Sequence, residues 1–399
     1  RRISLPNFRS DPKQNTFQFS QFHRNKMANA EKLLDLVFLL DVTSSMSSYI
    51  KSAQQNINGI VEKIVSSENA DIQFALIAYR DHPPQDRSFI TKVFDFTSSN
   101  RKMRQNVDGL SAQGGGDGPE AVTAALDEAL KLPYRKNSTK IVVLIADAPP
   151  HGLGESGDGF PNGDPLGRDP IAIAKQMLER GIVVYAVGCE PALSSYKFAR
   201  DFFAGLAKIT EGTFLPLSSA NLLADVILGG AKEEFSMEKL MAQVHQEAEE
   251  IRAEAPEAKV DEDELIDRIS ERMSKKKIET AKVSVDDLYG SWNQSNVDAM
   301  YAGSSLASVK AAWKPMAHAA PSIPVSTASS SLSFGGGFSA PRKKKSMRSL
   351  SKGDPDDLMA PAGAAPSMAP PAQSVRIEKS TVSREQVKKM YKRGIARKM

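Results

Sequence analysis

The sequence has almost no cysteine and no long apolar run. Cys189 is the only cysteine in 399 residues, which excludes an internal disulfide framework and a cysteine-based zinc site. A lone thiol is typical of a reducing compartment. No apolar run approaches the roughly 20 residues that a transmembrane helix needs. We therefore predict a cytoplasmic protein that contacts a membrane at most peripherally.

An excess of charge of one sign is also missing. The formal net charge is only +4, so charge alone gives no reason to expect a nucleic-acid partner. The hydrophobic content of 41% is ordinary, and a chain of this length has room for two domains. The distribution of apolar, charged and Ser/Pro/Gly-rich stretches is therefore more informative than the totals.

One apolar stretch organises the rest of the chain. Residues Leu33–Leu40 form an almost unbroken apolar run, typical of a central parallel strand buried on both faces. The run ends at Asp41, which is followed at alternate positions by Thr43 and Ser45. Ligands bind outside the carboxyl ends of strands in open α/β sheets, and these side chains offer only the hard oxygen atoms that Mg²⁺ prefers. Alternatively, the same residues cap a helix that begins near Ser47.

Strand and helix patterns alternate from residue 31 to residue 230. The predicted strands are Leu33–Leu40, Ile72–Tyr79, Ser88–Phe96, Ile141–Ala146, Ile182–Val187 and Thr213–Leu217, and the predicted helices are Ile50–Ile64, Pro119–Leu130, Pro170–Arg180, Lys197–Ile209 and Asn221–Leu228. The strand at 88–96 alternates with period two, as an edge strand does. Such an order implies an α/β, Rossmann-like domain, in which a mostly parallel sheet is flanked by helices.

Two further loops bring acidic residues toward the same predicted edge of the sheet. Asp117 lies in the glycine-rich loop 114–120, which bends into a helix, and Asp147 follows the strand at 141–146. Three carboxylates packed together at this edge would repel one another strongly without a cation. Helix capping alone therefore does not explain the pattern, and we predict a divalent metal site.

These motifs together resemble the von Willebrand factor A domain and its metal-ion-dependent adhesion site, over roughly residues 31–230. The family's Asp-x-Ser-x-Ser is matched by Asp41, Thr43 and Ser45, and its later aspartate by Asp147. The resemblance implies a bound divalent cation, Mg²⁺ or else Mn²⁺ or Ca²⁺. It also implies a protein partner that reaches the metal through an acidic residue.

The loop 114–120 departs from the usual family pattern. Asp117 stands where the family usually has threonine, and the loop, together with the stretch Tyr79–Pro84, is similar to the A domain of the atypical alpha-kinases. If Asp117 joins the metal shell, we expect tighter metal retention and less need for an acidic partner residue. Alternatively Asp117 points away from the metal, as the cap of the helix beginning at Pro119.

Enzymatic interpretations find little support. No phosphate-binding Gly-x-x-x-x-Gly-Lys loop exists, and Thr43 stands where a haloacid-dehalogenase-like phosphatase needs its second aspartate. His82 and His151 lie in loops near the predicted site, where they would contact a partner or act as bases; most loop histidines are surface residues. We predict a non-enzymatic, cation-dependent protein-binding scaffold. The alternative is a regulatory relative of an alpha-kinase that lacks the kinase domain.

The stretches outside this domain differ sharply in composition. We expect residues 1–30 to be a disordered leader, with order beginning close to Met27, and residues 231–290 to form an acidic helical arm. Residues 291–314 form a possible docking segment, because tryptophan is unusual in a linker. The stretch 315–375 is rich in Ser, Ala, Pro and Gly and is predicted to be disordered.

The last segment, 376–399, is predicted to be a basic amphipathic helix. Ser383 and Gln386 have the spacing of a capping box, and the apolar stripe that follows consists of Val387, Met390, Tyr391 and Ile395. Such a helix lies on an anionic membrane or docks in a partner groove. The acidic arm at 231–279 offers an intramolecular partner instead.

Overall fold

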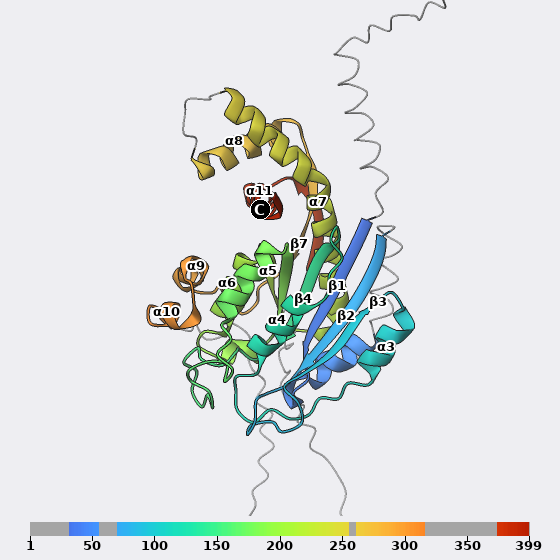
Figure 1. The fold of residues 1–399 in the computed structure, drawn as a ribbon, viewed down its shortest axis with the longest axis vertical. Coiled ribbons are helices and arrows are strands. Elements are labelled where there is room, and N and C mark those ends of the chain that lie inside the picture. The colour runs from blue at the N-terminus through green and yellow to red at the C-terminus, as the bar shows by residue number, and fades with distance from the viewer. Residues whose placement is uncertain (1–31, 56–69, 255–260, 316–372, 399) are drawn as a thin grey trace, which may run out of the picture.

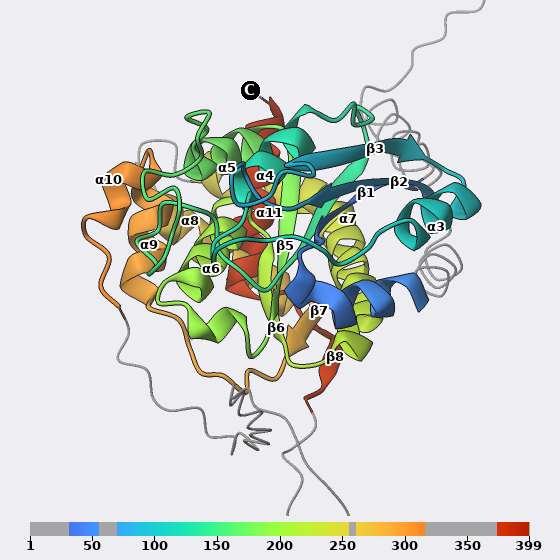
Figure 2. The same ribbon diagram turned by 90° about the horizontal axis from the view of Figure 1, so that it is seen from below.

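The main body is a six-stranded sheet in the order β3-β2-β1-β4-β5-β6. Strands β1 to β4 are labelled in Figure 1, and β5 and β6 in Figure 2. The computed structural model describes residues 32–55, 70–254, 261–315 and 373–398. The strands of this sheet are β1 (Lys32–Asp41), β2 (Ala70–Tyr79), β3 (Thr91–Thr97), β4 (Thr139–Ala146), β5 (Ile182–Cys189) and β6 (Thr213–Leu217). The predicted Rossmann-like architecture is confirmed.

The β1 strand occupies the centre of the sheet, as its apolar run predicts. It pairs in parallel with β2 on one side and with β4 on the other. The β3 strand is antiparallel to β2 and forms the sheet edge, which agrees with its period-two pattern. Because the other strands run parallel, the carboxyl ends of β1 and β4 meet at one edge.

Helices cover both faces of the sheet, which explains why its central strands are continuously apolar. One face packs against α4 (Val122–Lys131), α5 (Pro170–Glu179) and α6 (Ala199–Ile209). The other packs against the helical residues 47–55, α3 (Asn100–Asp108) and the first turns of α7 (Leu223–Glu254). The two layers are visible in Figure 2. Short 3-10 turns occur at η1 (Ser44–Met46), η2 (Leu193–Ser195) and η3 (Ala220–Leu222).

The α7 helix runs without a break through the domain boundary predicted at residue 230. Gly229 and Gly230 do not interrupt it, because added β-carbons there would lie 2.5 Å from Val283 and 3.0 Å from Tyr185, respectively. The two glycines thus allow close packing of the helix against its neighbours. Beyond them, α7 and α8 (Glu262–Lys275) form the predicted helical arm, with their own apolar cluster.

Two strands interrupt the regions predicted to be helical. The segment β7 (Glu279–Val285) lies inside the predicted arm, and β8 (Val375–Thr381) lies at the start of the predicted C-terminal helix. They pair antiparallel, with Val283 opposite Ile377. Alternation of β-branched and charged residues favours strands in both segments, and the helical prediction for them was wrong.

The C-terminal helix α11 (Arg384–Lys398) begins after the predicted capping box, which is confirmed. The Gln386 backbone N–H donates to Ser383 Oγ at 3.3 Å, and the Ser383 N–H donates to Gln386 Oε1 at 3.2 Å. The apolar residues Val387, Met390 and Tyr391 are buried in the cluster with α7 and α8. The intramolecular alternative therefore describes this helix, because the apolar face that membrane contact would require is covered.

The predicted docking segment packs onto the main body of this same chain. It forms α9 (Gln294–Ala302) and α10 (Leu306–Lys310), whose buried residues share a core with α6. Trp313 is buried there and lies beside Phe198. The predicted leader and nearly all of the predicted linker at 315–375 lie outside the described residues. Within the described ranges, no helix combines the length and apolarity needed to cross a membrane.

Candidate metal centre

The carboxyl edge of the sheet gathers the acidic residues that the sequence singles out. Asp41 is the last residue of β1, and Asp147 directly follows β4. These strands are parallel neighbours, with Leu40 opposite Ile145, so both carboxylates emerge at the same place. Ser45 connects them, since its hydroxyl hydrogen-bonds to Asp147 and lies 3.3 Å from the Thr43 hydroxyl.

The turn after β1 is arranged around Asp41 rather than as a helix cap. Asp41 Oδ1 accepts hydrogen bonds from the Thr43 hydroxyl at 2.6 Å and from the Thr43 backbone N–H at 2.9 Å. Thr43 is the N-cap residue of η1, but its side chain makes no capping hydrogen bond. Thr43 therefore does not cap η1 through its side chain, and the oxygens of Asp41, Thr43 and Ser45 lie together as a group.

Glu120 completes this group, although the sequence did not single it out as a ligand. Its backbone N–H donates to the Pro149 carbonyl at 2.9 Å, which holds the glycine-rich loop against the loop after β4. Gly115 has a positive φ, and a β-carbon there would lie 2.9 Å from Glu120 Oε1 and 3.4 Å from Thr43 Cβ. Glycine therefore lets the loop bring Glu120 close to Thr43. The sequence feature that could have predicted this ligand is the position of Glu120 at the end of the glycine-rich loop.

The three carboxyl groups are poorly neutralised by the surrounding protein. Asp41 Oδ2, Glu120 Oε2 and Asp147 Oδ1 are buried and have no hydrogen-bond partner. Burial and then the charge of Asp147 raise the pKa of Asp41 to about 7. Burial and then the charge of Asp41 raise the pKa of Glu120 to about 11, and burial also raises the pKa of Asp147. A divalent cation fits this arrangement, because it would supply the missing partner and the missing positive charge.

Asp117 lies to one side of this group. Its Oδ2 accepts a hydrogen bond of 2.5 Å from the Gly159 N–H, and its charged neighbours are Asp81 and His151. It does not cap α4, which begins at Val122 and has no side-chain cap. The prediction that Asp117 caps a helix beginning at Pro119 was wrong, because its side chain accepts a hydrogen bond from the loop at 158–160 instead.

His82 and His151 are internal residues rather than exposed loop residues. Each is only 2% exposed, which leaves no surface for direct contact with a partner and corrects that expectation. His82 Nε2 lies 3.2 Å from Asp164, and His151 lies 2.7 Å from Asp81 and 2.8 Å from Asp158. Although burial lowers the pKa of His151, its two carboxylate partners raise it overall to about 9. Both imidazoles therefore hold neighbouring carboxylates in place.

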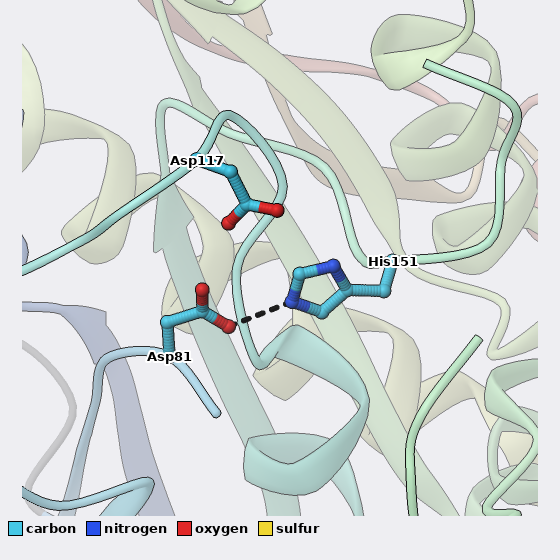
Figure 3. A group of neighbouring side chains, drawn as sticks. All are labelled: Asp81, Asp117 and His151. Carbon is cyan, nitrogen blue, oxygen red and sulfur yellow. Dashed lines mark hydrogen bonds and ion pairs between the residues drawn. The ribbon is translucent and has the colours of Figure 1, made fainter. Parts of the chain in front are cut away.

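Asp81 is the second acidic residue that the sequence analysis missed. It lies two residues beyond β2 and is fully buried. Figure 3 shows it facing Asp117 and hydrogen-bonded to His151. Its only sequence signal was its place in the stretch Tyr79–Pro84.

The chain is similar to known proteins in sequence and in structure. The family model described as the von Willebrand factor type A domain matches residues 35–211. The alpha-protein kinase vwkA of Dictyostelium discoideum is 35% identical over 145 residues, which is 36% of this chain and 23% of that protein. A putative ariadne-like RING finger protein of Acanthamoeba polyphaga mimivirus is 31% identical over 198 residues, which is 48% of this chain and 19% of that protein.

Two solved structures are more distant. The pilus adhesin SpaC of Lactobacillus rhamnosus GG is 15% identical, with a TM-score of 0.40, covering 52% of this chain and 31% of that chain. A von Willebrand factor type A structure from Catenulispora acidiphila is 13% identical, with a TM-score of 0.35, covering 52% of this chain and 43% of that chain.

The chain spans less than a quarter of the length of the two curated relatives, so the likeness concerns one domain of each. The strand order and the family model agree on that domain. Residues 35–211 of this chain form a von Willebrand factor type A domain.

Proposed function

We propose that the chain is a non-catalytic scaffold that binds a protein partner through a divalent cation at the carboxyl edge of its sheet. The observation that carries this proposal is the set of three buried carboxylate oxygens without a partner, on Asp41, Glu120 and Asp147. Buried carboxylates normally have hydrogen-bond or ionic partners. A cation is the simplest partner that would satisfy all three together.

The cation in this proposal is Mg²⁺, with Mn²⁺ or Ca²⁺ as the alternatives. Asp41, Thr43, Ser45, Glu120 and Asp147 would hold it, and all of them offer oxygen atoms, as Mg²⁺ prefers. When bound, the cation supplies a Lewis-acidic coordination position. Ser45 is exposed, so the group is open to solvent on its side, where an acidic residue of a partner would approach.

The non-catalytic part of the proposal rests on the two histidines at this edge. General bases must reach a proton of the substrate, whereas His82 and His151 are buried against carboxylates. Neither imidazole is exposed at the surface, where a substrate would approach. The proposal includes the cytoplasmic location predicted from the single cysteine. That cysteine, Cys189, is a free thiol buried in the structure.

A second candidate is a regulatory role in an alpha-kinase system. The observation in its favour is the 35% identity to the alpha-protein kinase vwkA over 145 residues. In that role the domain would bind a kinase or its substrate, and the chain itself would not bind nucleotide. Equilibrium binding of a fluorescent ATP analogue with micromolar affinity would instead point to a catalytic or ATPase role.

The proposal is tested by affinity capture with the full chain, in millimolar Mg²⁺ and in EDTA. We expect a defined set of proteins to be retained in Mg²⁺ and released by EDTA. Asp41→Asn should retain none of them. Glu264→Gln is the matched control, because it also removes one carboxylate, but from an exposed pair with Arg268 on the arm. Retention that is equal in EDTA, or equal for Asp41→Asn, would refute cation-dependent binding.

A further inference from the structure

A second group of metal-ligating side chains lies beside the first. Asp81 follows β2, Asp117 belongs to the glycine-rich loop, and His151 lies in the loop after β4. One ligand atom from each lies within 4.8 Å of the others. In Figure 3 the two carboxylates face one another and the imidazole approaches from a third side. Three different loops therefore converge on one small volume.

Two oxygens in this group accept no hydrogen bond from an N–H or hydroxyl donor. They are Oδ2 of Asp81, which is completely buried, and the buried Oδ1 of Asp117. The Asp81 and Asp117 carboxyl groups lie close enough to hydrogen-bond to each other, but only if a proton is shared between them. The other oxygen of each carboxylate is satisfied, by His151 for Asp81 and by the Gly159 N–H for Asp117. An unsatisfied buried acceptor is costly. Here two of them face the same volume, which points to a missing positively charged ligand.

The imidazole of His151 is oriented as in a metal site. Its Nδ1 lies 2.8 Å from Asp158 Oδ1. Asp158 is itself fixed by the backbone N–H groups of Gly152 at 2.7 Å and Phe160 at 2.8 Å. This arrangement directs Nε2 toward Asp81. In protein metal sites the ligating histidine usually donates its other ring N–H to such a carboxylate.

We propose that Asp81, Asp117 and His151 bind a second divalent cation, of the class that accepts imidazole nitrogen together with carboxylate oxygen, such as Mn²⁺ or Zn²⁺. Imidazole nitrogen is a usual ligand of Zn²⁺ and carboxylate oxygen a usual ligand of Mn²⁺, whereas Mg²⁺ and Ca²⁺ are bound by oxygen. Binding of the second cation releases the proton between Asp81 and His151 Nε2 to solvent, and the direct contact between the two side chains opens. The site goes beyond the proposed function, because it shares no ligand with the Asp41 group.

A purely structural ion pair is the competing explanation. The contacts of His151 with Asp81 and Asp158 would by themselves hold the loops after β2 and β4 together. That explanation accounts for one oxygen of Asp81, and pairing Asp81 with Asp117 without a cation requires a proton shared between their carboxyl groups. The second cation accounts for all of these atoms.

Nitrogen coupling to Mn²⁺ separates the two sites, because only the second contains a histidine. The full chain is loaded with Mn²⁺ and studied by pulsed electron paramagnetic resonance, alongside Asp41→Asn and His151→Gln. We expect nitrogen modulation in the wild type and in Asp41→Asn, and its loss in His151→Gln. One equivalent of Zn²⁺ should also remove it by competition.

Absence of nitrogen modulation in Asp41→Asn at saturating Mn²⁺ would overturn the second site, whatever the outcome of partner capture. If His151→Gln does not fold, as judged by circular dichroism, Asp117→Asn serves instead, because Asp117 lies on a partly exposed loop. We expect Asp117→Asn to weaken the nitrogen-coupled Mn²⁺ at least tenfold. An unchanged affinity in this variant would also refute the proposed ligand set.

Discussion

Arg393 anchors the C-terminal helix to both the arm and the main body. Its side chain is buried and donates hydrogen bonds to both carboxylate oxygens of Glu234 on α7, and to the backbone carbonyl of Glu211 in the turn between α6 and β6. Glu234 also accepts a hydrogen bond of 2.8 Å from the Tyr185 hydroxyl. A single arginine thus connects three elements that are far apart in the sequence.

Arg393→Met keeps most of the apolar stem of this side chain and removes its charge. Glu234 is then left buried with Tyr185 as its remaining partner among these groups, and breaking a buried ion pair from one side costs about 3–5 kcal/mol. The matched control is Arg384→Met on the same helix. Arg384 is 39% exposed and pairs with Asp263 and Asp267 at the surface, where such pairs are worth about 1 kcal/mol or less.

The free energy of unfolding is measured by urea titration, and the protection of residues 384–398 by hydrogen exchange. We expect Arg393→Met to lose several times more stability than Arg384→Met and to lose protection along α11. Adding Glu234→Gln to Arg393→Met should recover part of the loss, because it removes the uncompensated charge. Equal losses for the two arginine variants, with α11 still protected, would refute this account of the buried pair.

Three further outcomes are expected at the carboxyl edge. Without added metal, thermal stability should fall as the pH rises from about 4 to about 7, because the pKa of Asp41 is raised from its ordinary value to about 7 and the folded protein binds more protons than the unfolded chain over this range. Millimolar Mg²⁺ should flatten this fall, and equal slopes with and without Mg²⁺ would count against the site. In Glu120→Gln the new amide resembles the protonated carboxylic acid, so the melting temperature in EDTA should hardly change. The Mg²⁺ affinity measured by calorimetry should fall about tenfold, or 1.4 kcal/mol. An unchanged affinity would exclude Glu120 as a ligand. Asp117→Thr should change the Mg²⁺ affinity less than about threefold. A larger loss would indicate that Asp117 is a ligand of the same cation as Asp41.

The sheet could be predicted because its strands are buried on both faces. The apolar runs of β1 and β4 are typical of parallel strands buried on both faces, and Ser88–Phe96 differs from the observed β3 mainly at its boundaries. The β7–β8 pair could not be predicted in the same way. Six of the seven β8 residues are exposed, so the composition of β8 carries no pattern of burial. Its partner strand β7 also lies far away in the sequence.

The acidic edge could be predicted only in part. Asp41 and Asp147 stand at strand ends, where topology alone brings them together. Asp81 and Glu120 depend on contacts between loops, such as the Ala121 N–H to the Arg80 carbonyl at 2.9 Å, and neither spacing nor periodicity encodes such contacts. The burial of His82 and His151 follows from the same contacts, together with the packing of Phe160 against both rings.

Binding of a cation by the oxygens around Asp41 is the central property proposed for this domain. The most direct test is isothermal titration of the metal-free full chain with Mg²⁺, for the wild type, Asp41→Asn and the control Glu264→Gln. We predict saturable Mg²⁺ binding in the wild type and the control, and an affinity at least about a hundredfold weaker, or 2.7 kcal/mol, in Asp41→Asn. The melting temperature of the wild type should also rise with Mg²⁺, by the equivalent of about 2–3 kcal/mol of stability at a hundredfold excess over Kd. Mg²⁺ binding of the same affinity in Asp41→Asn, or no binding to the wild type, would contradict the account.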